Sequence, residues 1–261
     1  AMIDERSMLE TSASAWTVTE LGIYQVRRPL GRMGAPYGQY LLDDIGRIQA
    51  KLYVFLNAWQ LSATQRKAIL THTRGAGRIW CYVPGLHDGD RSSPEAMREL
   101  TGFRLVPVTP GKAWATPTEV GKQLGLQTAF GVDGPITPLF AAGDATPAET
   151  LATYPGGTAA VALRKIAGDW SLFVGAPGLT SELLRVAARK AGVHLFTETD
   201  CNVYANGPIV ALHAAQDGPV TVDTGHRGAI RDALTGDVLG NGRRITLSLK
   251  KGDTRVLRQY R

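Results

Sequence analysis

Residues 51–83 read KLYVFLNAWQLSATQRKAILTHTRGAGRIWCYV, and this stretch decides the fold. It begins with an apolar run at 51–58 and ends with another at 78–83, and both runs resemble strands that are buried on both faces. Between them, Ser62 followed three residues later by Gln65 is typical of a capping box at the start of a helix. A strand, a helix and a strand joined by short glycine-containing connections predict a parallel βαβ unit.

Strands and helices continue to alternate on both sides of this unit. Strands are expected at 1–4, 37–44, 103–108, 158–178 (as a hairpin) and 194–199, and helices at 14–33 (interrupted near Pro29), 94–102 and 180–193. This order is typical of proteins in which helices cover both faces of a sheet. We therefore expect an α/β fold with a doubly wound, mostly parallel, flavodoxin-like sheet.

The sequence pattern changes after residue 200. Short alternating strands are separated by the turn dipeptides NG, DG and TG and by a KKGD turn. Regular spacing of this kind is typical of a small antiparallel β-sandwich. We therefore expect two domains, an α/β domain over residues 1–199 and a β-sandwich over residues 200–261.

The composition excludes several classes of protein. The chain has 261 residues and a formal net charge of +6 from 29 basic and 23 acidic residues. The basic residues are scattered and lack interleaved aromatic residues, so we expect no binding to nucleic acid. There is no apolar run of the roughly 18 residues that a membrane span needs, and we expect no signal peptide before the first strand. We expect a soluble protein without a membrane partner, and we favour the cytoplasm.

Two cysteines raise the question of nucleophilic chemistry. Cys81 and Cys201 are too far apart in sequence for a CxxC metal or redox site, and no cofactor is expected. Cys81 lies near the end of an apolar strand that leads into a turn, where α/β enzymes expose a nucleophile. Such a cysteine needs partial exposure and a basic neighbour such as His87. Because helices cover both faces of a doubly wound sheet, we favour a buried, inert thiol.

The loop beyond this strand contains His87, Asp88 and Asp90. It follows the carboxyl end of a parallel strand, where open α/β sheets bind ligands. These side chains could form an acid/base pair or a weak metal site. Asp-Gly and Gly-Asp are also ordinary turn dipeptides, and we favour a solvated turn.

Further polar and aromatic residues follow strands that are expected to end at the same edge. The catalytic candidates are Asp4, Glu5, Cys81, His87 and Asp88, and the substrate-binding candidates are Asn57, Trp59 and Tyr82. Two carboxylates about 5 to 10 Å apart at this edge would suit glycoside hydrolysis. Trp59, Trp80 and Trp114 could stack on a sugar, although aromatic residues at strand ends more often pack in the core.

Several stretches in order resemble one known family. They are MIDERSM (2–8), LGRMGAPYGQYLLDDI (30–45), KLYVFLNAWQLSATQRKAI (51–69), WCYVPGL (80–86), PEAMRELTGFRL (94–105), HLFTETDCNVYANGPIVALHAA (194–215) and LSLKKGDTRVLR (247–258). Together they resemble the C-terminal half of β-galactosidase-like glycoside hydrolases of family 42. The resemblance implies a glutamine-amidotransferase-like α/β domain, called the trimerisation domain, followed by a small β domain.

The sequence departs from that family in two respects. The family's catalytic glutamates lie on a TIM barrel of about 250 residues, for which this chain has no room beside its two expected domains. The amidotransferase fold places its cysteine in a Gly-x-Cys-x-Gly elbow. Here Trp80 and Tyr82 flank Cys81, and no His-x-Glu pair follows.

The first functional hypothesis is therefore a non-catalytic oligomerisation or accessory portion of a β-galactosidase-like hydrolase. We expect such a protein to form a homo-oligomer, and the resemblance to the family implies a trimer. The alternative is a self-contained glycosidase or esterase with its site at the sheet edge. A third interpretation is a carbohydrate-binding protein. Whether the chain is an enzyme stays open at this point.

Overall fold

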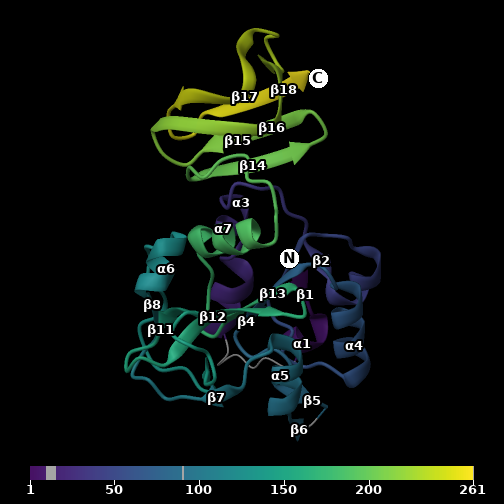
Figure 1. Cartoon of the computed structure of the whole chain (residues 1–261), viewed down its shortest axis with the longest axis vertical. Coiled ribbons are helices and arrows are strands. Elements are labelled where there is room, and N and C mark those ends of the chain that lie inside the picture. The colour runs from purple at the N-terminus through teal and green to yellow at the C-terminus, as the bar shows by residue number, and fades with distance from the viewer. Residues whose placement is uncertain (10–15, 90, 261) are drawn as a thin grey trace. The chain divides into compact units, whose positions relative to one another are not determined.

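The computed structural model describes residues 1–9, 16–89 and 91–260. The chain divides into two compact units (Figure 1). The first contains residues 1–26 and 39–191, and the second contains residues 27–38 and 192–261. The second unit thus includes a segment from near the N-terminus, whereas the expected division at residue 199 treats the domains as consecutive stretches. Within the described ranges, no helix is long and apolar enough to cross a membrane.

The first unit is built around a nine-stranded mixed sheet. Its parallel part comprises, in spatial order, β2 (Tyr40–Leu41), β1 (Met2–Ile3), β3 (Leu52–Phe55), β4 (Gly77–Cys81) and β13 (Asp169–Val174). The antiparallel part continues from β13 through β12 (Ala159–Ile166), β11 (Thr150–Thr153), β8 (Ala113–Pro117) and β9 (Phe130–Val132). The α/β class, the parallel βαβ unit and the predicted hairpin are confirmed.

The helices begin at the positions that their capping residues indicate. The longer ones are α4 (Ala63–His72), α5 (Pro94–Thr101), α6 (Glu119–Leu124) and α7 (Ser181–Lys190), and shorter turns are α1 (Glu5–Leu9), α2 (Trp16–Thr19), η2 (Glu20–Tyr24) and η3 (Leu42–Arg47). The Ser62 hydroxyl accepts the Gln65 amide at 3.2 Å, and the Gln65 side chain accepts the Ser62 amide at 3.0 Å. The predicted capping box is thus confirmed.

Helices cover both faces of the parallel part of the sheet. On one face, Tyr53, Phe55 and Trp80 pack with side chains from α4, α5 and η3 in one buried cluster. The Phe55 and Trp80 rings stack with their centroids 4.4 Å apart. On the other face, a side chain at Gly77 would lie 2.9 Å from the Cβ of Ala191, just beyond α7. Because both faces are covered, β4 is buried along its whole length.

Two expected elements differ from the prediction. Residues 194–199 are not a strand, because the Phe196 amide donates to the Gly34 carbonyl and the Phe196 carbonyl accepts the Asp223 amide, both at 2.7 Å within the second unit. The helix expected at 14–33 is interrupted, as predicted, but the break precedes α3 (Arg27–Gly31), which contains Pro29, and the described part before it forms α2 and η2. Residues 14 and 15 lie outside the described residues.

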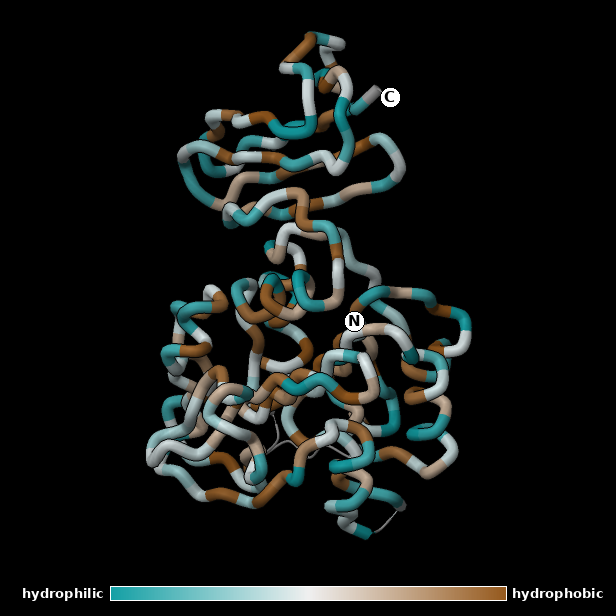
Figure 2. Tube along the Cα trace, in the orientation of Figure 1, coloured by the Kyte–Doolittle hydropathy of each residue, from teal (hydrophilic) through white to brown (hydrophobic). Residues whose placement is uncertain are grey.

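The second unit contains one five-stranded antiparallel sheet in the order β14 (Cys201–Asn206), β15 (Ile209–Ala214), β18 (Thr254–Tyr260), β16 (Gly218–Asp232) and β17 (Val238–Leu249). Hydrophobic and hydrophilic residues alternate along these strands (Figure 2). Buried side chains from all five strands form one cluster, so the sheet must curl around its own core. The antiparallel organisation is confirmed, but a single curled sheet replaces the expected two-sheet sandwich.

The segment 27–38 is fixed to this sheet by local contacts. Arg32 pairs with Asp200 at 3.0 Å. Gly34 adopts φ 94°, and a Cβ there would lie 1.8 Å from the Thr197 carbonyl oxygen. Only glycine allows both the backbone conformation and this close approach.

Candidate functional site

The carboxyl ends of β1, β3 and β4 meet at one edge of the sheet, as the sequence predicts. Asp4 follows β1, Asn57 lies two residues beyond β3, and Tyr82 follows β4 directly. Asp4 and Asn57 are buried. The structure therefore brings together the edge residues on which the sequence-based hypothesis of a sugar site depends.

Hydrogen bonds within the chain occupy the polar groups of this edge. The Asp4 amide donates to Asn57 Oδ1, and Asn57 Nδ2 donates to the Asp4 carbonyl, each at 2.8 Å. The Asp4 carboxylate accepts the Ser7 amide at 2.9 Å and the Ser7 hydroxyl at 2.5 Å. The Ser7 oxygen in turn accepts the amides of Trp59 and Gln60 at 3.1 and 2.9 Å. Asp4 thus caps α1 and anchors the loop after β3.

The two neighbouring candidates differ in exposure. Glu5 is exposed at the start of α1. Trp59 is buried, and its ring meets the Tyr82 ring edge-on with centroids 5.7 Å apart. Its indole Nε1 has no hydrogen-bond partner among the described residues. A ring closed off from solvent in this way offers no face for a sugar to stack on.

Cys81 is buried inside the sheet, and burial raises the pKa of its thiol to about 12. At neutral pH it is therefore a neutral thiol, which is a poor nucleophile. The strained backbone position is the next residue, because Tyr82 has φ 65°. The Tyr82 hydroxyl donates to the Pro138 carbonyl at 2.5 Å, and burial raises its pKa to about 12. A bulky, hydrogen-bonded tyrosine thus occupies the elbow.

The His87–Asp88 loop is held by an ion-pair network. Strands β5 (His87–Asp88) and β6 (Arg91–Ser92) form a small hairpin. Arg66 donates to Asp88 at 2.8 Å, to Glu99 at 2.9 Å and to the Leu61 carbonyl at 2.8 Å. Asp88 therefore serves to attach the loop to α4, while the His87 side chain is exposed.

The proposed metal ligands do not gather into a site within the part of the chain that the structure describes. No group of three or more His, Cys, Asp or Glu side chains there could hold a metal ion. Asp90 lies outside the described residues. Of the other tryptophans, Trp80 is fully buried and cannot stack on a sugar, whereas Trp114 on β8 is half-buried.

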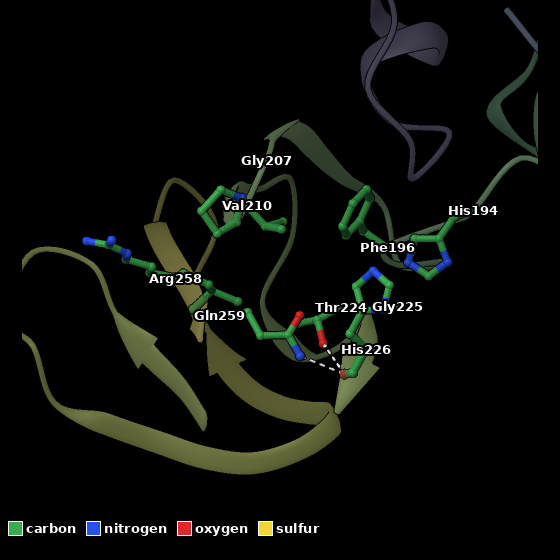
Figure 3. A pocket seen from close by; sticks show the side chains of 11 residues that line it. His194, Phe196, Gly207, Val210, Thr224, Gly225, His226, Arg258 and Gln259 are labelled. Carbon is green, nitrogen blue, oxygen red and sulfur yellow. Dashed lines mark hydrogen bonds between the residues drawn. The ribbon is translucent and has the colours of Figure 1, made fainter. Parts of the chain in front are cut away.

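A cavity of about 680 Å³ in the second unit has no counterpart in the sequence-based predictions (Figure 3). Its walls include Phe196, Val210, Leu257 and Pro208, with Thr224, His226 and Gln259 among its polar residues. These residues come from four separate segments of the chain. Periodicity cannot detect such a site, because only the folded sheet brings the segments together.

Short polar contacts define the rim of this cavity. His194 Nε2 lies 2.8 Å from the Asp223 carbonyl, and its ring meets Phe196 edge-on at 4.7 Å. Because a carbonyl only accepts, His194 carries its proton on Nε2. Gln259 Nε2 donates to the His226 carbonyl at 2.6 Å, and the Thr224 hydroxyl contacts the same carbonyl at 3.1 Å (Figure 3).

An α/β unit on a mixed nine-stranded sheet, with a second unit on a curled antiparallel sheet, defines a class of fold that is also found in the GH42 β-galactosidases. The β-galactosidase of Bacillus circulans sp. alkalophilus matches with a TM-score of 0.66 and 14% identity, over 99% of this chain and 41% of its own. A catalytic mutant of a GH42 β-galactosidase from G. stearothermophilus matches with a TM-score of 0.64 and 14% identity, over 100% of this chain and 40% of its own.

A third match is the cold-adapted β-galactosidase of Rahnella sp. R3, with a TM-score of 0.56 and 16% identity over 99% of this chain. The chain spans about two fifths of the length of these proteins, 40 to 41%. No protein-family model matches the sequence. A comparison with curated proteins also finds no match. At these identities the likeness shows the fold alone.

Proposed function

We propose that this chain is the non-catalytic accessory portion of a β-galactosidase-like glycoside hydrolase. In this proposal the first unit corresponds to a glutamine-amidotransferase-like trimerisation domain, and the second to the small β domain that follows it. The fold that the chain shares with part of the GH42 β-galactosidases supports the assignment.

One observation carries the proposal: most of the candidate groups at the sheet edge are already used to hold the fold or are buried, and of those that the structure describes only Glu5 and His87 are exposed. The Asp4 carboxylate binds Ser7, Asn57 binds the Asp4 backbone, and Asp88 binds Arg66. The thiol of Cys81 is buried and neutral. A general acid or base must reach a substrate proton within hydrogen-bond distance, and these groups instead satisfy each other.

Self-association is the second part of the proposal, and exposed apolar side chains support it. Leu234 lies in the turn between β16 and β17, and Val238 is the first residue of β17; they are 80% and 58% exposed. Tyr204, on the edge strand β14, is 67% exposed. Large apolar side chains gathered at a hairpin tip and on a sheet edge are typical of protein interfaces.

Sedimentation velocity of the purified chain over a wide range of concentration tests self-association. We expect a concentration-dependent trimer, because an interface formed only by association obeys mass action. Leu234→Asp and Val238→Asp should shift the distribution towards the monomer. The matched control is Asn241→Asp, which adds the same charge at an exposed polar position on β17. A monomer at every concentration would overturn this part of the proposal.

A parallel assay on aryl glycosides and aryl esters tests the absence of catalysis. We expect no turnover above background. Turnover that is lost in Glu5→Ala or His87→Ala would overturn the accessory role and favour a self-contained hydrolase. These two variants alter exposed side chains, so their effect would not arise from unfolding.

A further inference from the structure

The positive charge of the chain is concentrated in the second unit. Residues 27–38 and 192–261 contain twelve basic and seven acidic residues, a surplus of five out of the total net charge of +6. The first unit is therefore nearly neutral. A small domain with this surplus attracts anions by its overall field.

Part of this charge is organised around one carboxylate, that of Asp223 on β16. Arg243 Nε donates to Asp223 Oδ1 at 2.7 Å, and Arg244 Nε donates to Oδ2 at 2.8 Å. The Gly225 amide also donates to Oδ1 at 2.9 Å. Burial of Asp223 would raise its pKa, but these donors outweigh it and lower the pKa to about 2. The carboxylate is therefore charged at neutral pH and fixes both guanidinium groups.

The arginines remain able to bind an anion. Each guanidinium has five N–H donors, and Asp223 takes only the Nε donor of Arg243 and of Arg244. Arg227 lines the same open cavity as these two residues, and it has no ion-pair partner among the described residues. Three guanidinium groups against one carboxylate leave a local surplus of two positive charges.

This cluster adjoins the cavity of Figure 3. Asp223 connects the two, because its Oδ1 lies 3.9 Å from His194 Nε2 in the cavity wall and 2.7 Å from Arg243 Nε. Thr224, Gly225 and His226 line the cavity, and Arg227 follows them directly in β16. The cavity offers the Phe196 ring, apolar walls and the Gln259 amide. Aromatic faces with nearby amide and hydroxyl groups suit a sugar ring.

We propose that the cavity and the adjoining cluster of Arg227, Arg243 and Arg244 form one binding site for an acidic saccharide, whose ring lies in the cavity and whose oxyanion binds the guanidinium groups. Carboxylate and sulfate both match the planar fork of arginine. The inference goes beyond the proposed function, since it requires neither self-association nor a catalytic partner. Nucleic acid would also be attracted to the arginines, but among the residues that line the cavity Phe196 is the one Phe, Tyr or Trp, and its ring meets His194 edge-on, so the cavity lacks a row of stacking platforms.

Isothermal titration of the full chain with four probes tests the site: an oligogalacturonide, a sulfated galactan oligosaccharide, a neutral galactan oligosaccharide and inorganic sulfate. We expect at least one acidic saccharide to bind more tightly than both the neutral saccharide and sulfate, and the tighter of the two identifies the acid group. Equal affinity for sulfate and the acidic saccharides would overturn the proposal, as would no binding at all or tighter binding of a DNA oligonucleotide.

Charge reversal locates the site. Arg227→Glu should weaken binding of the acidic saccharide about tenfold or more, as expected for loss of a charge-assisted hydrogen bond. Lys251→Glu is the matched control, since it makes the same charge change at an exposed position in the turn after β17, outside the cluster. Phe196→Leu keeps an apolar side chain and removes the aromatic face, so it should weaken binding several-fold. If Arg227→Glu and Lys251→Glu weaken binding equally, the saccharide is attracted only by the overall positive charge of the second unit. That result would overturn the proposed site.

Discussion

Asp4 and Asn57, which lie 53 residues apart in sequence, hold each other through two reciprocal hydrogen bonds of 2.8 Å. The Asn57 side chain accepts from the Asp4 amide and donates to the Asp4 carbonyl, so it continues the backbone pairing of β1 and β3 beyond the last strand residues. A side-chain amide in this arrangement satisfies two buried backbone groups that no strand reaches.

Asn57→Ala should therefore destabilise the protein without affecting any activity. It would leave a buried amide and a buried carbonyl without partners, and we expect a loss of about 2–4 kcal/mol in the free energy of unfolding. Urea denaturation followed by circular dichroism measures the change. Asn241→Ala, at an exposed position, is the control and should leave the midpoint unchanged. An unchanged midpoint for Asn57→Ala would contradict the assigned role.

Cys81 should be inert towards alkylating reagents in the folded protein. Burial raises the pKa of its thiol to about 12, so almost no thiolate is present near pH 8. Iodoacetamide followed by peptide mass spectrometry should show labelling of Cys81 only after denaturation. Cys201 is also buried and serves as an internal comparison. Rapid labelling of Cys81 in the native protein would reopen the nucleophile hypothesis.

Arg66 and Asp88 should contribute unequally to the free energy of unfolding, although they form one ion pair. The Arg66 side chain is 10% exposed and also binds Glu99 and the Leu61 carbonyl, whereas Asp88 is 38% exposed. Arg66→Met should cost about 2–4 kcal/mol, because it removes several partly buried contacts at once. Asp88→Asn should cost less than about 1 kcal/mol, as is usual for exposed pairs. Thermal and urea unfolding of the two variants measure both losses of stability. A larger loss for Asp88→Asn than for Arg66→Met would contradict the prediction.

The pair of Arg164 and Glu149 should make stability depend on acidic pH. The hydrogen bond from Arg164 lowers the pKa of Glu149 from 4.5 to about 2 in the folded protein. Because the pKa of Glu149 is lower in the folded protein, the ion pair stabilises the fold fully above about pH 4.5. This stabilisation is lost as the pH falls towards 2. Glu149→Gln should be less stable at pH 7 by about 2 kcal/mol, with a smaller decline across the acidic window.

Unfolding experiments at a series of pH values measure this difference. Glu119→Gln is the control, because Glu119 forms an exposed pair with Lys122 on α6. It should leave the pH profile unchanged. Parallel acid profiles for the wild type and Glu149→Gln would contradict the contribution assigned to the Arg164 contact.

Local features of the chain could be predicted well. The capping box of Ser62 and Gln65, the helix expected at 180–193 (α7) and the hairpin of β12 and β13 all form as expected. Each depends on residues within a few positions of one another, so their sequence contains the necessary information. The parallel βαβ unit was predictable for the same reason, since its two apolar strands flank one capped helix.

The candidate site was predictable in part. Chain order placed Asp4, Asn57 and Tyr82 at one sheet edge, but it could not show that Asp4 and Asn57 bind each other or that Tyr82 takes the strained backbone position. The cavity in the second unit was missed, because its walls come from segments around residues 194, 208, 225 and 258. No local pattern links segments so far apart.

The sequence by itself determined the capped helix α4, the hairpin of β12 and β13 and the parallel βαβ unit, because caps, turns and hydrophobic periodicity act over a few residues. Only the tertiary structure decided which polar groups remain free. Hydrogen bonds such as that between Asn57 and Asp4 join distant segments and occupy polar groups that a catalytic site would need. The Asp223 carboxylate, in contrast, binds the Nε donors of two arginines from another strand and leaves their outer N–H donors open.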